Sequence, residues 1–218
     1  MQKLQRPAGS GIGKYFFLIF GVLWTGITCC VTVPIIVGTG GVGFTAGEPL
    51  AILSSIGFPL IFAVCFGGIG VVFIVLGLRP IIAGMRVSPP DISISSTNLR
   101  SGDEFTLGYQ QTFKGAVDVT QFSIQLVLRE SATYRRGTDT VTVTHDYLIQ
   151  NFELAEKRFE SGETLSQNLR WAIPRGAMHS FEANRNKLRW LIKVKVGMKG
   201  WPDYDDEFEI KVLPEMAR

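Results

Sequence analysis

The chain has 218 residues, of which 46% are hydrophobic and 19% are charged, and its formal net charge is +3. So small a positive charge does not favour a nucleic-acid partner. The charges are unevenly spread. Between Tyr15 and Leu78 the only formal charge is Glu48, whereas charges recur throughout the chain from Asp91 onward. This split predicts a membrane-embedded first third followed by one soluble domain.

The first apolar segment, residues 15–37, follows an N-terminal segment, residues 1–14, that contains Lys3, Arg6 and Lys14. A bilayer core about 30 Å thick is crossed by about 20 apolar helical residues, so the apolar segment is long enough to span it. A cleaved signal peptide also begins with basic residues, but its apolar region is only about 7–15 residues long. No clear A-x-A cleavage site follows here, and we therefore expect an uncleaved transmembrane helix.

A second apolar segment, residues 50–78, meets the same length requirement. The segment between the two spans, residues 38–49, is rich in glycine and contains no Lys or Arg, so we expect a short external loop. After the second span, residues 79–90 end in Ser-Pro-Pro, which favours a stiff linker.

Positive residues that flank transmembrane helices are retained on the cytoplasmic side. Three precede the first span, and Arg79 and Arg86 follow the second. All three cysteines (Cys29, Cys30 and Cys65) lie within the spans, so the soluble domain has none for a disulfide, which agrees with a reducing compartment. We therefore expect an integral plasma-membrane protein, in a bacterial inner membrane, with its N-terminus and C-terminal domain in the cytoplasm.

Small residues spaced four apart occur in both spans, and this spacing lets helix backbones approach closely within lipid. The candidate helix-packing residues are Gly21, Thr25, Gly26, Cys30, Ala63, Gly67 and Gly70. They predict either packing of the two helices on each other, which we favour, or contact with a second copy or another membrane subunit. Neither span contains Asp, Glu, Lys, Arg or His, so a channel or transporter acting alone is not expected.

Residues 91–214 alternate apolar and polar side chains with a period of two, and Gly-containing turns interrupt the pattern. About seven such segments predict an all-β antiparallel sandwich of the arrestin or immunoglobulin type. In the clearest strand Trp190, Ile192 and Val194 are expected to point inward. The side chains expected on its outer face form a basic row: Lys187, Arg189, Lys193 and Lys195.

This basic row is a candidate surface for anionic lipid or for a protein partner. Near an anionic leaflet each positive charge contributes about 1 kcal/mol. If the last two strands pair, however, Glu207 and Glu209 lie opposite the row and neutralise much of its charge. We favour neutralisation, because a sandwich predicts that pairing.

Residues 173–214 resemble the closing strands of an arrestin-type sandwich domain. The matching features are Pro174 followed by Ser180-Phe181, a Trp-x-Ile-x-Val-x-Val strand from Trp190 to Val196, and a last strand that ends in Val-x-Pro. Arrestin-like proteins carry two such sandwiches, whereas this chain has room for one. The resemblance implies a domain class that binds proteins rather than one that catalyses reactions.

No motif points strongly to catalysis, a cofactor or a metal. The Gly-rich residues 38–43 and 9–14 resemble nucleotide-binding loops, but the first joins two membrane spans and the second lacks the Ser or Thr that binds Mg²⁺. His145 and His179 have no Cys or other His at ligand spacing. The acidic loop 203–207 lacks the spacing of an EF-hand, and whether it binds a cation stays open.

Together these patterns predict a two-helix membrane anchor that carries a cytoplasmic, non-catalytic interaction or scaffold module. Its expected partners are the lipid bilayer and a protein met at the membrane surface, and no cofactor is expected. The alternative is an accessory subunit of a membrane enzyme or transporter complex, bound through the small residues of its helices. Homo-oligomerisation is also left open.

Overall fold

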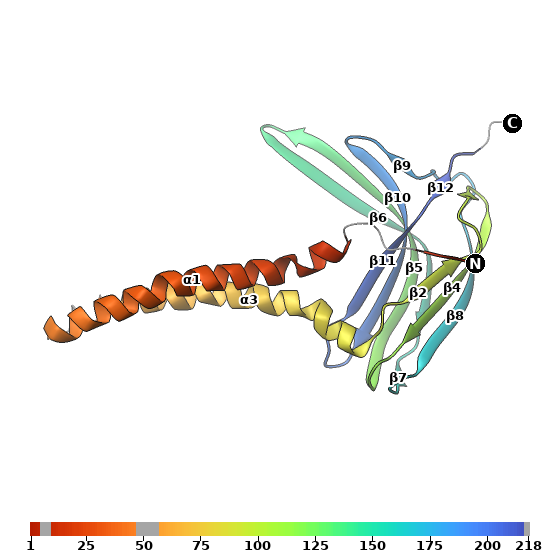
Figure 1. The fold of residues 1–218 in the computed structure, drawn as a ribbon. Coiled ribbons are helices and arrows are strands. Elements are labelled where there is room, and N and C mark those ends of the chain that lie inside the picture. Colours follow the sequence, from red (N-terminus) through yellow and green to blue (C-terminus); the bar gives the residue numbers. More distant parts are fainter. Residues whose placement is uncertain (5–9, 47–56, 216–218) are drawn as a thin grey trace. The chain divides into compact units, whose positions relative to one another are not determined.

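The structure is a computed structural model that describes residues 1–4, 10–46 and 57–215 (Figure 1). The chain divides into two compact units. One consists of Gly9–Ile81, and the other combines Met1–Ala8 with Ile82–Arg218. The first is helical and the second is built of strands, as the split in charge predicts.

The helical unit contains two long helices, α1 (Ser10–Ala46) and α3 (Phe58–Arg86), and the last residues of α3 belong to the β unit. Both are long and apolar enough to cross a membrane. Only 17% of the most apolar stretch of α1 and 11% of that of α3 are buried. A helix that is apolar on all sides is typical of a protein core or of a membrane span. Because so little of these helices is covered by the chain itself, their apolar surface needs another apolar environment.

Both helices extend beyond the ends predicted from the sequence. Helix α1 continues to Ala46, so the predicted Gly-rich loop 38–49 is helical up to that residue, and its last residues lie outside the described part of the chain. Glycine disfavours a helix in water by about 1 kcal/mol relative to alanine, which is why the pattern indicated a turn. Glycine is nevertheless frequent in transmembrane helices. The first seven residues of the predicted span 50–78 are also outside the described residues.

Much of the predicted linker 79–90 is helical as well, because α3 continues through Pro80 to Arg86. Its last turn belongs to the β unit. The Lys114 ammonium group donates to the Gly84 carbonyl at 2.8 Å, and the Arg86 guanidinium lies 3.9 Å from the centre of the Trp201 ring. Ala83 and Val87 are buried in the sandwich core. This end of the helix is therefore a packed part of the domain rather than a free linker.

The β unit has two principal antiparallel sheets. The four-stranded sheet has the order β1 (Gln2–Lys3), β2 (Asp91–Ile94), β4 (Glu104–Thr112) and β8 (Thr164–Ala172). The larger sheet has the order β11 (Tyr204–Ile210), β10 (Asn186–Met198), β5 (Val117–Arg136) and β6 (Asp139–Leu154), with β7 (Lys157–Phe159) on β5 and β9 (Phe181–Glu182) on β10. A short parallel pair joins β3 (Leu99–Arg100) to β12 (Val212–Leu213).

The inner faces of the two sheets share one hydrophobic core. Leu107 and Tyr109 come from the four-stranded sheet, and Phe122, Trp190 and Ile192 come from the larger one. The rings of Tyr109 and Phe122 meet edge to face with their centres 5.4 Å apart. The predicted antiparallel β domain with inward-facing apolar residues is therefore confirmed, and its seven longest strands lie within the predicted range 91–214.

Strand β1 has no counterpart in the sequence prediction. Gln2 and Lys3 pair with Ile94 and Ser93, and the Lys3 ammonium group lies 2.6 Å from the Asp91 carboxylate. The chain thus starts in the β unit, leaves it for the helices and returns at Ile82. If both helices cross a membrane, β1 and the remaining strands are on the same side of it.

Candidate functional site

The basic row of β10 lies on the outer face of the larger sheet. Strand β10 pairs with β5 on one side and with β11 on the other, so the expected pairing of the last two long strands is present. Lys193 lies opposite Glu207 in this register. Every member of the row has an acidic neighbour: Lys187 and Arg189 approach Glu182, Lys193 approaches Asp146 and Glu207, and Lys195 approaches Asp203. The row is therefore largely neutralised, as that pairing implies.

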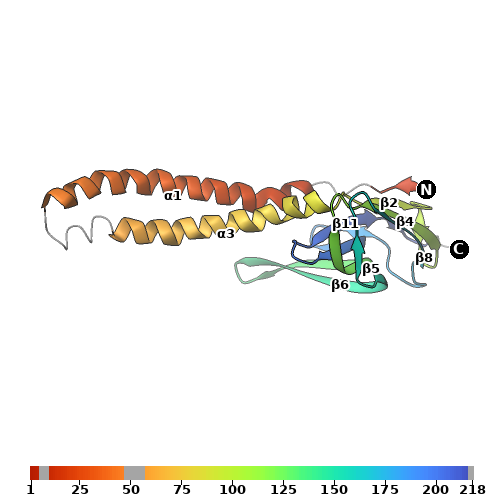
Figure 2. The same ribbon diagram turned by 90° about the horizontal axis from the view of Figure 1, so that it is seen from below.

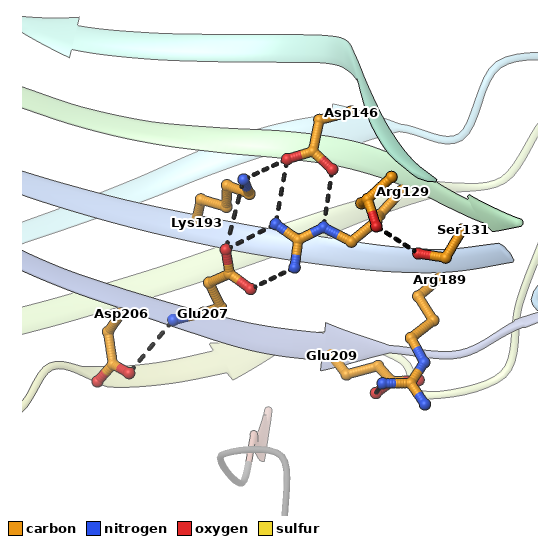
Figure 3. Close-up of polar contacts among 9 residues, drawn as sticks. Arg129, Ser131, Asp146, Arg189, Lys193, Asp206, Glu207 and Glu209 are labelled. Atoms are coloured by element: carbon orange, nitrogen blue, oxygen red, sulfur yellow. Dashed lines mark hydrogen bonds and ion pairs between the residues drawn. The ribbon is translucent and has the colours of Figure 1, made fainter. Parts of the chain in front are cut away.

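The centre of this face is an ion-pair network around Arg129 (Figure 3). The guanidinium donates to both carboxylate oxygens of Asp146, at 2.7 and 3.1 Å, and to both of Glu207, each at 2.8 Å. Lys193 donates to Asp146 and lies 3.4 Å from Glu207. The four side chains come from β5, β6, β10 and β11, so the network links all four main strands of the sheet.

The network holds both carboxylates in their ionised form. Hydrogen bonds from Arg129 lower the pKa of Asp146 well below its usual range, even though partial burial opposes this shift. Burial also disfavours the ionised form of Glu207, but hydrogen bonds and charge from Arg129 and Lys193 keep its pKa below the ordinary value. The two carboxylates in turn raise the pKa of Arg129. Groups so firmly paired are suited to joining strands rather than to transferring protons.

The predicted acidic loop is part of a strand. Tyr204 begins β11, and from there the side chains alternate between the two faces of the sheet. Asp206 is buried, whereas Asp205 is exposed and Glu207 joins the Arg129 network on the outer face. The carboxylates are therefore divided between two faces, and within the described ranges no group of three or more His, Cys, Asp or Glu is arranged to hold a metal.

Neither histidine belongs to a metal-binding group within the described residues. His145 is exposed on β6, where its ring lies 4.4 Å from that of Tyr147. The adjacent Asp146 points to the opposite face, toward Arg129, because neighbouring residues in a strand alternate. His179 is exposed in the segment between β8 and β9.

Three glycines lie at the contact between α1 and α3. A Cβ atom added at Gly21 would lie 2.7 Å from the backbone nitrogen of Ile74, and one at Gly77 would overlap the backbone of Leu18. A Cβ atom at Gly70 would overlap the Thr25 hydroxyl. Glycine at these positions therefore allows the two backbones to approach closely.

The other two candidate glycines, Gly26 and Gly67, are not at this contact. Gly26 and Gly67 have open space where a side chain would start, Cys30 is exposed, and Ala63 is partly buried. Three of the seven candidates (Gly21, Thr25 and Gly70) are thus brought together. The contact residue Gly77 was not among the candidates.

Polar and aromatic contacts support the helix pair. The indole nitrogen of Trp24 donates to the Phe66 carbonyl at 2.9 Å, and the two rings stack. The Phe73 ring packs against Phe17 and Phe20. These contacts lie along one side of each helix, and large apolar side chains cover the rest.

The first prediction concerns Arg129. Arg129→Met should lower the free energy of unfolding by about 1–3 kcal/mol, because it leaves two partly buried carboxylates with Lys193 as their remaining partner in the network. Thermal unfolding of the full chain in detergent, followed by near-UV circular dichroism, measures the effect. The control is Arg158→Met, which removes a highly exposed cation and should change stability by no more than about 0.5 kcal/mol. Equal effects of the two changes would contradict the assigned role of Arg129.

The second prediction concerns pH. Because the folded protein lowers the pKa of Asp146 below the ordinary 3.8, ionised Asp146 stabilises the fold at neutral pH, and this stabilisation is lost as the pH falls below about 4. The melting temperature of the wild type should exceed that of Asp146→Asn at pH 7, and the difference should shrink toward pH 3. A difference that stays constant across this range would show that Asp146 does not contribute through its charge.

The third prediction concerns the helix contact. Gly77→Leu should destabilise the helix pair by about 1–3 kcal/mol, because the new side chain meets the Leu18 backbone. Loss of the helical circular-dichroism signal on heating in detergent is the measurement. Gly67→Leu is the matched control, since nothing lies within 4 Å of the added atom, and it should melt as the wild type does. If both variants melt together, Gly77 is not at a helix contact.

Comparisons with known proteins give no family for this chain. No family model matches it, and no curated protein sequence matches it either. Among solved structures, the crystal structure of Spo0M, a sporulation control protein from Bacillus subtilis, is similar over 58% of this chain and 49% of Spo0M, with a TM-score of 0.47 and 14% identity. The similar region therefore covers about half of Spo0M. A likeness of this size carries no argument about function, and the arrestin-type assignment of residues 173–214 stays a prediction.

Proposed function

We propose that this protein is a membrane-anchored β-sandwich that binds a protein partner at the cytoplasmic surface of the membrane. The observation that carries the anchor is the apolar surface of α1 and α3. Large exposed apolar side chains occur along both helices, including Phe16, Ile19, Leu23, Ile27, Val33, Leu60, Val64, Ile69, Val72 and Val75. Soluble monomers rarely expose contiguous apolar patches of this kind, whereas lipid accommodates them without penalty.

The orientation follows from two independent features. Strand β1 pairs with β2, which requires the N-terminal residues and the sandwich to be on one side of the bilayer. Lys3 precedes α1, and Arg79 and Arg86 lie in the final turns of α3, toward the sandwich, whereas residues 38–49 carry no Lys or Arg. Because flanking positive residues are retained in the cytoplasm, the sandwich is cytoplasmic.

The sandwich itself is suited to binding rather than to chemistry. Its two sheets form a rigid frame that presents strand edges and turns. The ionisable groups with the largest pKa shifts on its outer face are held by one another in the Arg129 network. Ala83 and Val87 are already in the sandwich core, so the domain begins within the last turn of the second helix, and its partner is met close to the membrane.

The fourth prediction tests the anchor and its orientation. The full chain expressed in a bacterium should remain in the membrane fraction after alkaline carbonate washing. Green fluorescent protein fused after Arg218 should fluoresce, and alkaline phosphatase at the same position should be inactive. The control is a chain cut after Ala46, where α1 ends, which should give the opposite pair of results because it contains one span. A chain that purifies without detergent, or phosphatase activity after Arg218, would refute the proposal.

The same preparation distinguishes the alternative function, an accessory subunit that docks through its helices. Gly26, Gly67 and Gly68 have open space beside them on the helix surfaces, which is the feature that favours this alternative. A chain cut after Arg86 retains both helices and lacks the strands that follow. Proteins cross-linked to the full chain in native membranes should disappear with this truncation if the sandwich is the binding part. Their retention would favour the accessory subunit.

A further inference from the structure

Strand β6 forms one edge of the larger sheet. It pairs with β5 over the whole hairpin, and no strand of the described chain pairs with its other side. Figures 1 and 2 both show this hairpin extending away from the centre of the sandwich. An edge strand presents unpaired backbone N–H and C=O groups, and it therefore offers a template on which a further strand can pair.

The outer half of this edge lacks the usual protection against pairing. Natural edge strands carry Lys, Pro or a bulge, or are covered by another element. Residues 140–144 read Thr-Val-Thr-Val-Thr, with no charge, proline or glycine. The irregularity in the pairing lies beyond them, at Ile149, and the Ala172 backbone of the four-stranded sheet donates a hydrogen bond to β6 further along, at Gln150.

The two faces of the hairpin remain different in polarity beyond the sandwich core. On the outer face Thr142 bonds Thr133 at 2.9 Å, and Thr144 bonds Ser131 at 3.2 Å. On the inner face lie Tyr134, opposite Val141, and the residues Val143 and Tyr147, with the polar pair Glu130 and His145 between the last two. Residues directly opposite each other share a face, and the pairing of Leu128 with both Tyr147 and the buried Trp190 identifies this face as the continuation of the core.

This inner face is uncovered. Tyr134, Val143 and Tyr147 are 47%, 50% and 45% exposed, although they continue the apolar side of a sheet that is buried elsewhere. Apolar side chains next to a free strand edge gain by association, because one partner can extend the sheet and reduce this exposure at once.

The sequence of the edge indicates which partner fits. Read in either direction from Thr142, the strand places Thr at 140 and 144 and Val at 141 and 143. At the next positions, 139 and 145, stand Asp and His. A two-fold interface requires a surface that is complementary to itself, and antiparallel pairing of two such strands about Thr142 supplies it. Valine meets valine, threonine meets threonine, and each Asp139 meets the His145 of the other copy.

We propose that a second copy of this chain pairs with β6, in antiparallel register and with Thr142 of both copies on the two-fold axis. In this register residues 138–146 of the two copies overlap, and each hairpin tip reaches Tyr147 of the other copy. Residues opposite each other in an antiparallel pair point to the same side, so the apolar inner faces of both hairpins join on one face of a continuous sheet. The proposal stands on the sheet edge alone and holds whether or not the helices span a membrane.

Disulfide cross-linking of the full-length chain tests the register, with Cys29, Cys30 and Cys65 replaced by alanine. Opposed Cα atoms in antiparallel strands are about 4.5–5.5 Å apart, which lies within the range that a disulfide bridges. Thr142→Cys should therefore shift to twice the monomer mass on non-reducing gels after mild oxidation. Thr144→Cys is the control, because its two copies would be about 13 Å apart along the strands. Mixing Thr140→Cys with Thr144→Cys should restore the dimer band.

A charge at the axis gives an independent test. Thr142→Lys places two like charges opposite each other on the edge, and the dimer measured by light scattering in detergent should be lost while the circular-dichroism spectrum is unchanged. Three results would overturn the proposal: a monomeric wild type, cross-linking of Thr144→Cys equal to that of Thr142→Cys, or a Thr142→Lys dimer. Each of these results would mean that a lipid surface or a different protein, rather than a second copy, contacts the edge of β6.

Discussion

The position of β10 between β5 and β11 is the constraint on which the sandwich depends. Because side chains alternate along a strand, β10 supplies Trp190 and Ile192 to the core and Lys193 to the outer face. Its register with both neighbours brings Arg129 and Glu207 beside Lys193. A slip of one residue would move the inward-facing apolar side chains of β10, such as Trp190 and Ile192, to the outer face and separate the network at the same time. Core packing and surface ion pairing therefore specify the same register.

Among the described residues, apolar side chains are left uncovered on the two helices and on the β5–β6 hairpin, and each of these surfaces points to an external partner. On α1 and α3 they occur on nearly all sides, which suits lipid, and the close contacts between the helices are made by glycines. On the β5–β6 hairpin they occupy one face only and adjoin a free strand edge. That arrangement suits another polypeptide, because an edge gains both backbone hydrogen bonds and apolar contacts from a strand.

Much of the fold could be predicted from local patterns. Hydropathy identified the two long apolar helices, and the period of two identified the main strands and inward residues such as Trp190 and Ile192 on β10. The position of Glu207 opposite Lys193 could also be predicted, once the last two long strands were assumed to pair. These features could be predicted because hydrophobic periodicity depends only on neighbouring residues and on whether each is apolar or polar. The ends of the helices were harder to predict, because glycine and proline interrupt helices in water but are tolerated within transmembrane helices.

The sequence by itself therefore determined the division into an apolar helical part and an antiparallel β domain, together with the inward-facing residues of its clearest strands. Only the tertiary structure decided which distant side chains meet. Arg129 lies 17 positions from Asp146 and 78 from Glu207, and no spacing rule connects residues so far apart. The pairing of Gln2 and Lys3 with β2 and the contact of Gly77 with Leu18 are of the same kind. Such contacts depend on sheet order and helix rotation, which arise from packing of the whole chain rather than from any local segment.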